Sequence, residues 1–213
     1  MAEIDEERRP GRRPSTSHAR IEAVGLALFA ERGFDHVSVD DIAAEVGIGR
    51  RTLFRYFRSK NDIVWGAFDT HLDEWERWLH DEADDVPLLH AIRAGVVHFN
   101  TFSDDVLESH RVRMSLILNN PVLQAHATLR YQKWRGVVAR LAGERLGCRP
   151  DDFTPMVIAH IALGAALASY EQWLLDPQSD LVDLLDRALG VLAESVNLTV
   201  VPTLAPDAPP RRR

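Results

Sequence analysis

The feature that most constrains the fold is a break between two short helical patterns, at Gly47-Ile48-Gly49. Before it, Ser38 and Asp41 have the spacing of a capping box, and apolar residues recur at helical intervals up to Val46. Two glycines allow a sharp turn, within which Ile48 can enter the core between the helices. The segment Ser38–Lys60 therefore predicts two short helices joined by a tight turn, the arrangement of a helix-turn-helix.

Helical spacing of apolar residues covers nearly all of the remaining chain. The pattern from Ile21 to Phe29 stops at Gly33, a residue type that often ends helices. A long helix is predicted from Ser59, which has Asp62 at the capping distance, to about Glu82. Its apolar seam consists of Ile63, Phe68, Leu72, Trp75 and Leu79. Further helices are predicted at about 88–103, 105–119, 121–147, 152–176 and 181–197. Because the sequence has no alternating strand pattern, we expect an all-α protein of about nine helices.

Charge is distributed unevenly along the chain. The net charge of −7 by itself argues against a nucleic-acid partner. Residues 1–60, however, sum to about +1, and the remainder sums to about −8. Two stretches, Arg8–Arg20 and Val46–Lys60, each contain five basic residues and no acid. Concentrated basic segments of this kind are typical of phosphate contacts, although two merely solvated faces would give the same pattern.

The second helix of the predicted helix-turn-helix displays arginines on its outward face, while Leu53 and Phe57 are expected to face inward. Arg50 and Arg51 stand at its N-terminal end, where a helix in the major groove meets base edges. An arginine there can donate two hydrogen bonds to guanine. Side chains placed to touch phosphates are Thr52, Arg55, Tyr56 and Lys60. An ordinary helical hairpin with solvated arginines is the alternative.

Several runs in this region match a known signature. They are Phe29-Ala30-Glu31-Arg32-Gly33-Phe34, Val39-Asp40-Asp41-Ile42-Ala43, Val46-Gly47-Ile48, Thr52-Leu53-Phe54-Arg55-Tyr56-Phe57 and Ser59-Lys60. Together they resemble the DNA-binding signature of the TetR family of bacterial regulators, over about residues 17–66. The resemblance implies a three-helix DNA-binding head, a helical effector domain, and a homodimer formed by the last two long helices. It also implies that the effector releases the protein from its double-stranded DNA operator.

The resemblance assigns roles to individual residues by position. DNA contacts fall on Arg50, Arg51, Thr52, Phe54, Tyr56 and Lys60. Phe54 is expected to meet a thymine methyl rather than to pack inside. Val39 stands where many relatives have Thr or Ser against a phosphate, so that contact is not expected here.

Further runs extend the likeness to most of the chain. They are Gly11-Arg12-Arg13-Pro14, Val64-Trp65-Gly66, Leu123-Gln124-Ala125-His126-Ala127-Thr128-Leu129-Arg130-Tyr131 and Tyr170-Glu171-Gln172-Trp173-Leu174. These resemble the mycofactocin-system transcriptional regulators of actinobacteria. That resemblance implies autoregulation of a redox-cofactor gene cluster and an acyl-coenzyme A effector.

Four parts are expected along the chain: a flexible basic arm at 1–16, a helix-turn-helix domain at 17–64, an effector-binding and dimerisation domain at 65–200, and a disordered, proline-rich tail at 201–213. The arm either adds phosphate or minor-groove contacts or is purely disordered. The helix at 152–176 is apolar nearly all round, so we expect it to be buried on most sides. With 181–197 it is expected to form a four-helix dimer interface.

The second domain combines large apolar side chains with polar ones, as ligand pockets do. The candidate effector residues are Phe99, Phe102, Arg111, Met114, Leu118, Arg130, Trp134, His160, Tyr170 and Trp173. Arg113 is a further cation that could meet an anionic ligand. For each residue taken singly, a place in the core or in a salt bridge is the commoner role.

Other classes of protein are disfavoured. Gly47-x-Gly49 follows no predicted strand, the nine histidines lack the paired spacing of a metal site, and Cys148 has no evident His partner. We therefore expect no enzyme, cofactor or metal. The apolar run Met156–Tyr170 is shorter than a bilayer span, and the N-terminus lacks a secretory signal, so a cytoplasmic protein without a membrane partner is expected. A helical protein-interaction module and a TetR-type regulator of an unrelated efflux or metabolic operon are the alternatives.

Overall fold

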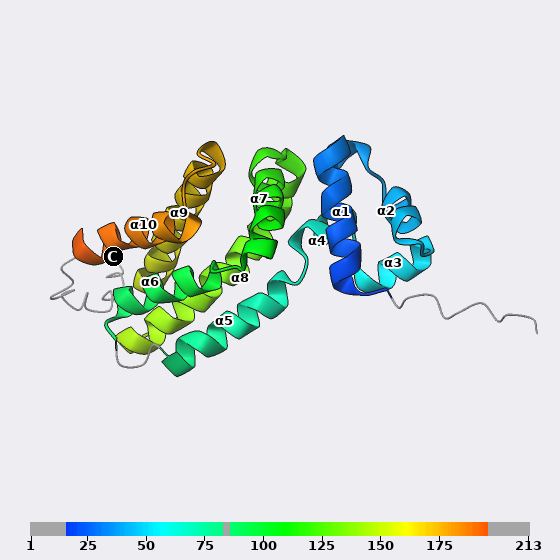
Figure 1. The fold of residues 1–213 in the computed structure, drawn as a ribbon. Coiled ribbons are helices and arrows are strands. Elements are labelled where there is room, and N and C mark those ends of the chain that lie inside the picture. The colour runs from blue at the N-terminus through cyan, green and yellow to red at the C-terminus, as the bar shows by residue number, and fades with distance from the viewer. Residues whose placement is uncertain (1–15, 83–85, 196–213) are drawn as a thin grey trace, which may run out of the picture. The chain divides into compact units, whose positions relative to one another are not determined.

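The computed structural model describes residues 16–82 and 86–195, and all regular structure in these ranges is helical (Figure 1). The all-α prediction is confirmed. The helices are α1 (His18–Arg32), the 3-10 helix η1 (Phe34–His36), α2 (Val39–Val46), α3 (Arg50–Tyr56), α4 (Lys60–Trp65), α5 (Phe68–Glu82), α6 (Leu88–Phe99), α7 (Asp104–Asn119), α8 (Pro121–Leu146), α9 (Phe153–Leu175) and α10 (Leu181–Ser195). The predicted arm, apart from Thr16, and the predicted tail lie outside the described residues.

The predicted continuous helix from Ser59 to Glu82 is wrong, because Gly66 interrupts it. α4 ends at Trp65, and Gly66 has φ 53° and ψ −130°, which is not a helical conformation and favours glycine. A Cβ atom at this position would also overlap the carboxylate of Glu22. The chain resumes as α5 at Phe68. This break accounts for one α-helix more than the nine expected from the sequence.

The chain divides into two compact units. The first contains the described residues up to Ala67 together with Glu108–Leu123, so most of α7 belongs to it. Within this unit α1 packs on α2 and α4, and α2 contacts α3. The core side chains are almost fully buried and include Ile21, Phe29, Ile42, Leu53 and Ile63. These apolar contacts hold α2 and α3 against a framework made by α1 and α4. We refer to α1–α4, together with η1, as the head.

The second unit contains Phe68–Leu107 and the described residues from Gln124 onward. In it α10 packs on α9 and α6, and α5 packs on α6. Arg93 of α6 donates two hydrogen bonds of 2.6 Å to the carboxylate of Asp186 on α10. The hydrogen bond from Arg93 holds the pKa of Asp186 below its usual value, and partial burial opposes this only weakly.

Helix α9 differs from its predicted environment. It is long and apolar enough to cross a membrane by length and composition, alone among the helices in the described ranges, but only 39% of its most apolar window is buried. The exposed apolar side chains on α9 are Phe153, Met156, Ile161 and Leu175. The prediction of burial on most sides is therefore not met within a single chain.

Candidate functional site

The helix-turn-helix forms through the predicted capping chemistry. At the start of α2, Ser38 Oγ accepts a hydrogen bond from the Asp41 amide at 3.1 Å, and Asp41 Oδ2 accepts one from the Ser38 amide at 2.7 Å. Hydrogen bonds from the Ser38 side chain and backbone hold the pKa of Asp41 below its usual value. Gly47 then adopts the left-handed conformation with φ 79°, and the Ile48 amide donates to the Ala43 carbonyl at 2.9 Å. These bonds end α2 and set the direction of α3.

Helix α3 has a basic outward face. Its exposed side chains are Arg50, Arg51, Phe54 and Arg55, and Thr52 is half-buried. Leu53 is fully buried and Phe57 nearly so, which confirms that these two residues face inward. The ring of Phe54 is 40% exposed, so it does not pack inside the head. The outward residues thus combine guanidinium groups with one accessible aromatic ring.

Arg50 is oriented by two neighbours. Its Nη1 lies 2.5 Å from Oδ2 of Asp40 on α2, and its guanidinium lies 5.4 Å from the centroid of the Phe54 ring. Both charged side chains are more than half exposed, so the ion pair adds little stability. It does hold the guanidinium beside α2. Asp40 was missed as a site residue, because only the fold brings it next to Arg50.

Tyr56 is directed toward α1. Its hydroxyl donates to the Thr16 carbonyl at 2.8 Å, and its ring meets His18 edge-on with centroids 4.9 Å apart. The single hydroxyl proton is used in this bond, so a phosphate contact from Tyr56 requires the bond to open. Tyr56 thus links α3 to the beginning of α1. In the sequence, the arginine-rich stretch directly precedes this beginning of α1.

Lys60 is also engaged within the head. Its Nζ donates to the carbonyls of Phe34 at 2.7 Å and Val37 at 3.0 Å, and it lies 4.1 Å from the centroid of the Phe34 ring. An ammonium group has three N–H donors, so one donor is left for a phosphate. The lysine therefore joins α4 to η1 and can still contribute to a DNA contact.

An open groove of about 760 Å³ lies beside the turn of the helix-turn-helix. It is lined by Thr16, Arg20, Val46, Gly47, Ile48, Gly49 and Thr52. Arg20 and Thr52 thus border the same groove, although in the sequence Arg20 belongs only to a basic stretch. Only the packing of α1 against α2 could have placed it there.

The candidate effector residues are divided between the two compact units. Arg111, Met114 and Leu118 belong to the first unit, and the other seven belong to the second. Three of the seven, Phe99, Phe102 and Trp134, lie in an aromatic cluster with residues of α5. The Phe99 ring lies 4.9 Å from the rings of both His71 and Trp75, and Trp75 stacks on Trp134 at 5.0 Å. Phe102 lies 6.0 Å from His71, so α5 supplies the centre of the cluster.

The remaining four residues of the second unit have different environments. Tyr170 and Trp173 are buried, and the Tyr170 hydroxyl donates to Asn100 Oδ1. Arg130 lies 2.8 Å from Asp69. Burial raises the pKa of Asp69, but hydrogen bonds from Lys133 and Arg130 outweigh it and leave that pKa lowered. His160 is exposed on α9, and its Nδ1 lies 2.8 Å from the Met156 carbonyl oxygen.

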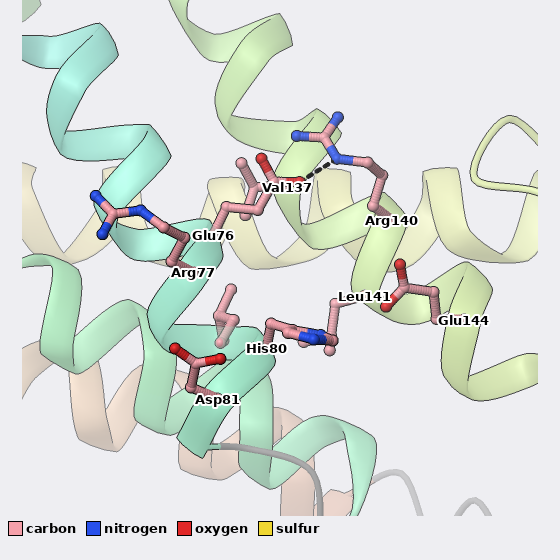
Figure 2. A pocket seen from close by; sticks show the side chains of 9 residues that line it. Glu76, Arg77, His80, Asp81, Val137, Arg140, Leu141 and Glu144 are labelled. Carbon is pink, nitrogen blue, oxygen red and sulfur yellow. Dashed lines mark hydrogen bonds and ion pairs between the residues drawn. The ribbon is translucent and has the colours of Figure 1, made fainter.

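A separate groove of about 290 Å³ opens between α5 and α8 (Figure 2). Leu79, Val137 and Leu141 give it an apolar floor, and an ion pair between Glu76 and Arg140 lies at its rim. None of the ten candidate effector residues lines it. Its charged lining residues are of both signs: Glu76, Asp81 and Glu144 are acidic, and Arg77 and Arg140 are basic.

Comparison with known proteins decides the family. Residues 21–65 match the family described as bacterial regulatory proteins, tetR family, and residues 86–197 match the MftR C-terminal domain. The chain belongs to the TetR family. As a TetR-family member with an MftR-type C-terminal domain, it is a DNA-binding transcriptional regulator.

A relative with the same combination is known from Mycobacterium tuberculosis. This TetR-family chain is 44% identical over 191 residues to the protein MftR, which is assigned to the regulation of mycofactocin biosynthesis. The match covers 90% of this chain and 96% of that relative. The predicted resemblance to mycofactocin-system regulators is thus confirmed.

Solved structures agree on the fold. A TetR-family protein of Syntrophomonas wolfei matches with TM-score 0.65 and 18% identity, over 87% of this chain and 97% of that one. SmeT, the repressor of the Stenotrophomonas maltophilia multidrug efflux pump SmeDEF, matches with TM-score 0.61 and 20% identity, over 92% and 98%. FadR of Bacillus subtilis in complex with stearoyl-CoA matches with TM-score 0.60 and 16% identity, over 84% and 100%. At these identities the likeness shows the TetR fold alone.

Proposed function

We propose that this regulator is a homodimeric repressor that acts in the cytoplasm, binds a palindromic operator and is released by a small hydrophobic effector. We further propose that the effector is a long-chain acyl-coenzyme A and that the regulated genes form a mycofactocin-type cluster. The observation that carries the DNA-binding part is the exposed basic face of α3 in a complete helix-turn-helix.

The chemistry of α3 fits the reading of a major groove. Arg51 is exposed, and no acidic side chain pairs with it among the described residues, so it is available to donate two hydrogen bonds to O6 and N7 of one guanine. Arg50 stands next to it with its guanidinium held by Asp40. The exposed Phe54 ring offers an apolar contact for a thymine methyl. Thr52, Arg55, Tyr56 and Lys60 are the proposed phosphate contacts.

The dimer is proposed from the uncovered face of α9. Phe153 is 72% exposed and Leu175 is 80% exposed, at opposite ends of the helix. Between them, a Cβ on Gly164 would meet nothing within 4 Å, so another helix could approach closely there. A two-fold copy of α9 and α10 would cover this face on both chains. It would also present two α3 helices to successive major-groove faces, about 34–36 Å apart or a multiple of it, and hence a palindromic operator.

The effector is proposed from relatives and from the aromatic cluster of the second unit. The B. subtilis FadR neighbour holds stearoyl-CoA, and the 44%-identical MftR is assigned to mycofactocin regulation. The cluster around Trp75, Phe99 and Trp134 supplies the apolar lining that an acyl chain requires. An effector releases DNA only if it binds more tightly to the conformation in which the two α3 helices are wrongly spaced.

An unrelated efflux operon is a second candidate target, because the SmeT neighbour represses a multidrug efflux pump. For that target the effector would be a hydrophobic compound without a coenzyme A group. A helical protein-interaction module would need neither DNA nor an effector. These candidates differ in their ligands and can be separated in one titration.

The test is fluorescence anisotropy of the full chain on labelled DNA from upstream of its own gene, with a scrambled duplex of equal composition as the control. We expect binding at least about 1,000-fold tighter to the upstream DNA at fixed salt. Stearoyl-CoA and lauroyl-CoA should release it, whereas free coenzyme A should not. Equal binding to both duplexes would refute sequence-specific regulation. Triclosan is the compound in a solved SmeT complex, so release by triclosan but by no acyl-CoA would favour the efflux alternative.

A further inference from the structure

A sheltered ion pair inside the first unit joins α7 to α1. Arg113 Nη2 donates to Glu22 Oε1, and the two side chains are only 17% and 19% exposed. The Arg50–Asp40 pair of the same unit is by contrast about 60% exposed on both sides. Breaking a sheltered pair is costly because it leaves one charge without a partner and without full hydration. The Arg113–Glu22 pair is therefore a specific constraint on how α7 and α1 lie together.

Arg113 also reaches a second helix of the DNA-reading head. Its Nη1 donates to the carbonyl of Trp65 at 3.3 Å, and Trp65 is the last residue of α4. A cation at the C-terminal end of a helix interacts favourably with the unpaired carbonyls there. One guanidinium thus holds both α1, through Glu22, and the end of α4.

Gly66 makes this arrangement possible. The Glu22 carboxylate occupies the space that a Cβ atom at residue 66 would need, and the positive φ of Gly66 separates α4 from α5. Any other residue would push Glu22 away from Arg113. The three residues therefore form one contact, the Arg113–Glu22–Gly66 latch, at the junction where α4 ends.

A second, weaker contact lies just after the C-terminal end of α7. Asn120 Nδ2 is 3.4 Å from Oδ2 of Asp35, the middle residue of η1. The same Asn120 accepts hydrogen bonds from the amides of Val122 and Leu123 at the start of α8. The head thus has two contacts with this segment, one from Arg113 within α7 and one from Asn120 at the α7–α8 turn, and only the first is sheltered from solvent.

We propose that Arg113 is a positioning residue for DNA binding, which makes the orientation of α1 and α4, and of the α3 helix they support, follow the position of α7. Helix α7 starts at Asp104 in the second unit and runs without interruption to Asn119 in the first. A displacement of α7 is thereby passed to the head through the latch. The part of the inference that concerns an effector rests on the proposed function. The latch itself does not.

Two expectations from the sequence are revised by these contacts. The predicted continuous helix from Ser59 to Glu82 is interrupted at Gly66. Arg113, expected as a cation that could meet an anionic ligand, is paired with Glu22. We therefore place the coupling in a side-chain contact made by α7.

The first test measures the head directly, without DNA or effector. Spin labels are placed at Glu45 on α2 and Glu108 on α7, both exposed, after the exposed Cys148 is replaced by serine. Labelled chain is diluted with excess unlabelled chain, so that double electron–electron resonance reports the distance between the two labels within one molecule. We expect a narrow distance distribution in the parent protein and at least a twofold broader one in Arg113→Gln and Glu22→Gln.

Three further variants sharpen this test. Arg113→Lys keeps the charge but loses the planar fork that serves two acceptors, so it should give an intermediate width. Gly66→Ala changes no charge but places a Cβ atom where the Glu22 carboxylate lies, so it should broaden the distance distribution as Arg113→Gln does. Arg140→Gln removes an ion pair in the second unit and should leave the width unchanged. Unchanged widths in folded Arg113→Gln or Glu22→Gln would overturn the proposal. Circular dichroism identifies any variant that does not fold, and the isosteric Glu22→Gln then carries the test.

The second test asks whether the latch transmits the effector signal. The ratio of operator Kd with and without stearoyl-CoA is measured for the parent, Arg113→Gln and Arg140→Gln. We expect the ratio to fall at least fivefold in Arg113→Gln and to stay at the parent value in Arg140→Gln. A parent ratio of one would mean that stearoyl-CoA is not the effector. The distance measurement would still show whether Arg113 positions the head. An unchanged ratio in Arg113→Gln would show that the signal travels by another route.

Discussion

The two compact units differ in where their chemically distinctive side chains lie. In the first unit, the arginines of α3 and the Phe54 ring point outward, so a DNA duplex can contact them without any rearrangement of the unit. In the second unit, Trp134, Tyr170 and Trp173 are buried against other residues of the same unit. The basic face of α3 is exposed in the single chain, whereas the surroundings of the buried residues in the second unit depend on how its helices pack. The difference explains why the first unit can be interpreted residue by residue and the second cannot.

The largest expected effect tests how closely the aromatic cluster, proposed above as the apolar lining for an acyl chain, is packed in the protein without a ligand. Trp134→Ala should lower the free energy of unfolding by about 3–5 kcal/mol, because it removes a buried ring stacked on Trp75 and leaves a cavity. Leu129→Ala on the same helix is the control, since Leu129 is 66% exposed and should cost less than about 0.5 kcal/mol. Urea unfolding measures both. A loss below about 1 kcal/mol at Trp134 would mean that the cluster already contains room for a ligand.

A charge on α9 tests the proposed role of its uncovered face. Ile161→Asp should weaken dimerisation by about 100-fold or more, because a carboxylate buried without a partner opposes association. Gln132→Asp, at an exposed position of α8, adds the same charge elsewhere and should leave the dimer intact. Sedimentation velocity over a concentration series gives the dimer Kd. Equal dissociation constants for the two variants would exclude α9 from the interface.

Arginine removal tests the outward chemistry of α3. Arg51→Ala or Arg50→Ala should weaken operator binding by about 1–3 kcal/mol and relax the preference at one base position, because a bidentate contact to guanine is lost. Arg77→Ala, an exposed arginine of the second unit, is the matched control and should bind normally. Competition with operators mutated at single positions measures the effect. A uniform loss on every sequence would assign these arginines to phosphate contacts instead.

Lys60 links the stability of the head to its DNA contact. Lys60→Ala should destabilise the protein by about 1–2 kcal/mol, since the carbonyls of Phe34 and Val37 lose a charged donor. It should also weaken binding to all duplexes and flatten the salt dependence by about one unit. Lys133→Ala serves as the control, because that lysine pairs with Asp69 in the second unit. An unchanged salt slope would restrict Lys60 to the structural role.

The smallest effect concerns acid pH. The lowered pKa of Asp186 means that its pair with Arg93 stabilises the folded state above the unfolded pKa, about 3.9, and that this stability is lost as pH falls through the lower folded value. Asp186→Asn should therefore cost less than about 1 kcal/mol at pH 7 and flatten the pH dependence of the unfolding free energy below about pH 4. Asp183→Asn on the exposed side of α10 should leave that dependence as it is. A pH profile of Asp186→Asn that matches the parent would show that the pair adds no stability.

How well each region could be predicted from the sequence depends on how far apart in the chain its interacting residues are. The capping box at Ser38 and the turn at Gly47 depend on residues a few positions apart, so the helix-turn-helix and the inward positions Leu53 and Phe57 could be predicted. The break at Gly66 could not, because the apolar seam continues across it. At this position a Cβ atom would overlap the carboxylate of Glu22, which is 44 positions earlier in the chain.

The individual site residues depend in the same way on contacts between distant parts of the chain. The pairing of Arg50 with Asp40, of Tyr56 with Thr16 and of Arg113 with Glu22 arises only when helices pack, so no spacing in the sequence predicts it. The candidate effector residues share size and polarity, two properties that core residues also have, and they fall in both units. The ring contacts of Phe99 with His71 and Trp75 of α5 likewise depend on packing and could not be predicted.

Through the proposed dimer, the uncovered face of α9 makes the stability of the protein, and its occupancy of DNA, depend on protein concentration. If a second chain supplies the cover, folding and association are linked, and the melting temperature rises with protein concentration. Dilution would then dissociate the two chains and leave Phe153, Ile161 and Leu175 exposed together as an apolar surface on each of them. The occupancy of a palindromic operator would also rise more steeply than the concentration of the chain, because the species that binds contains two of them.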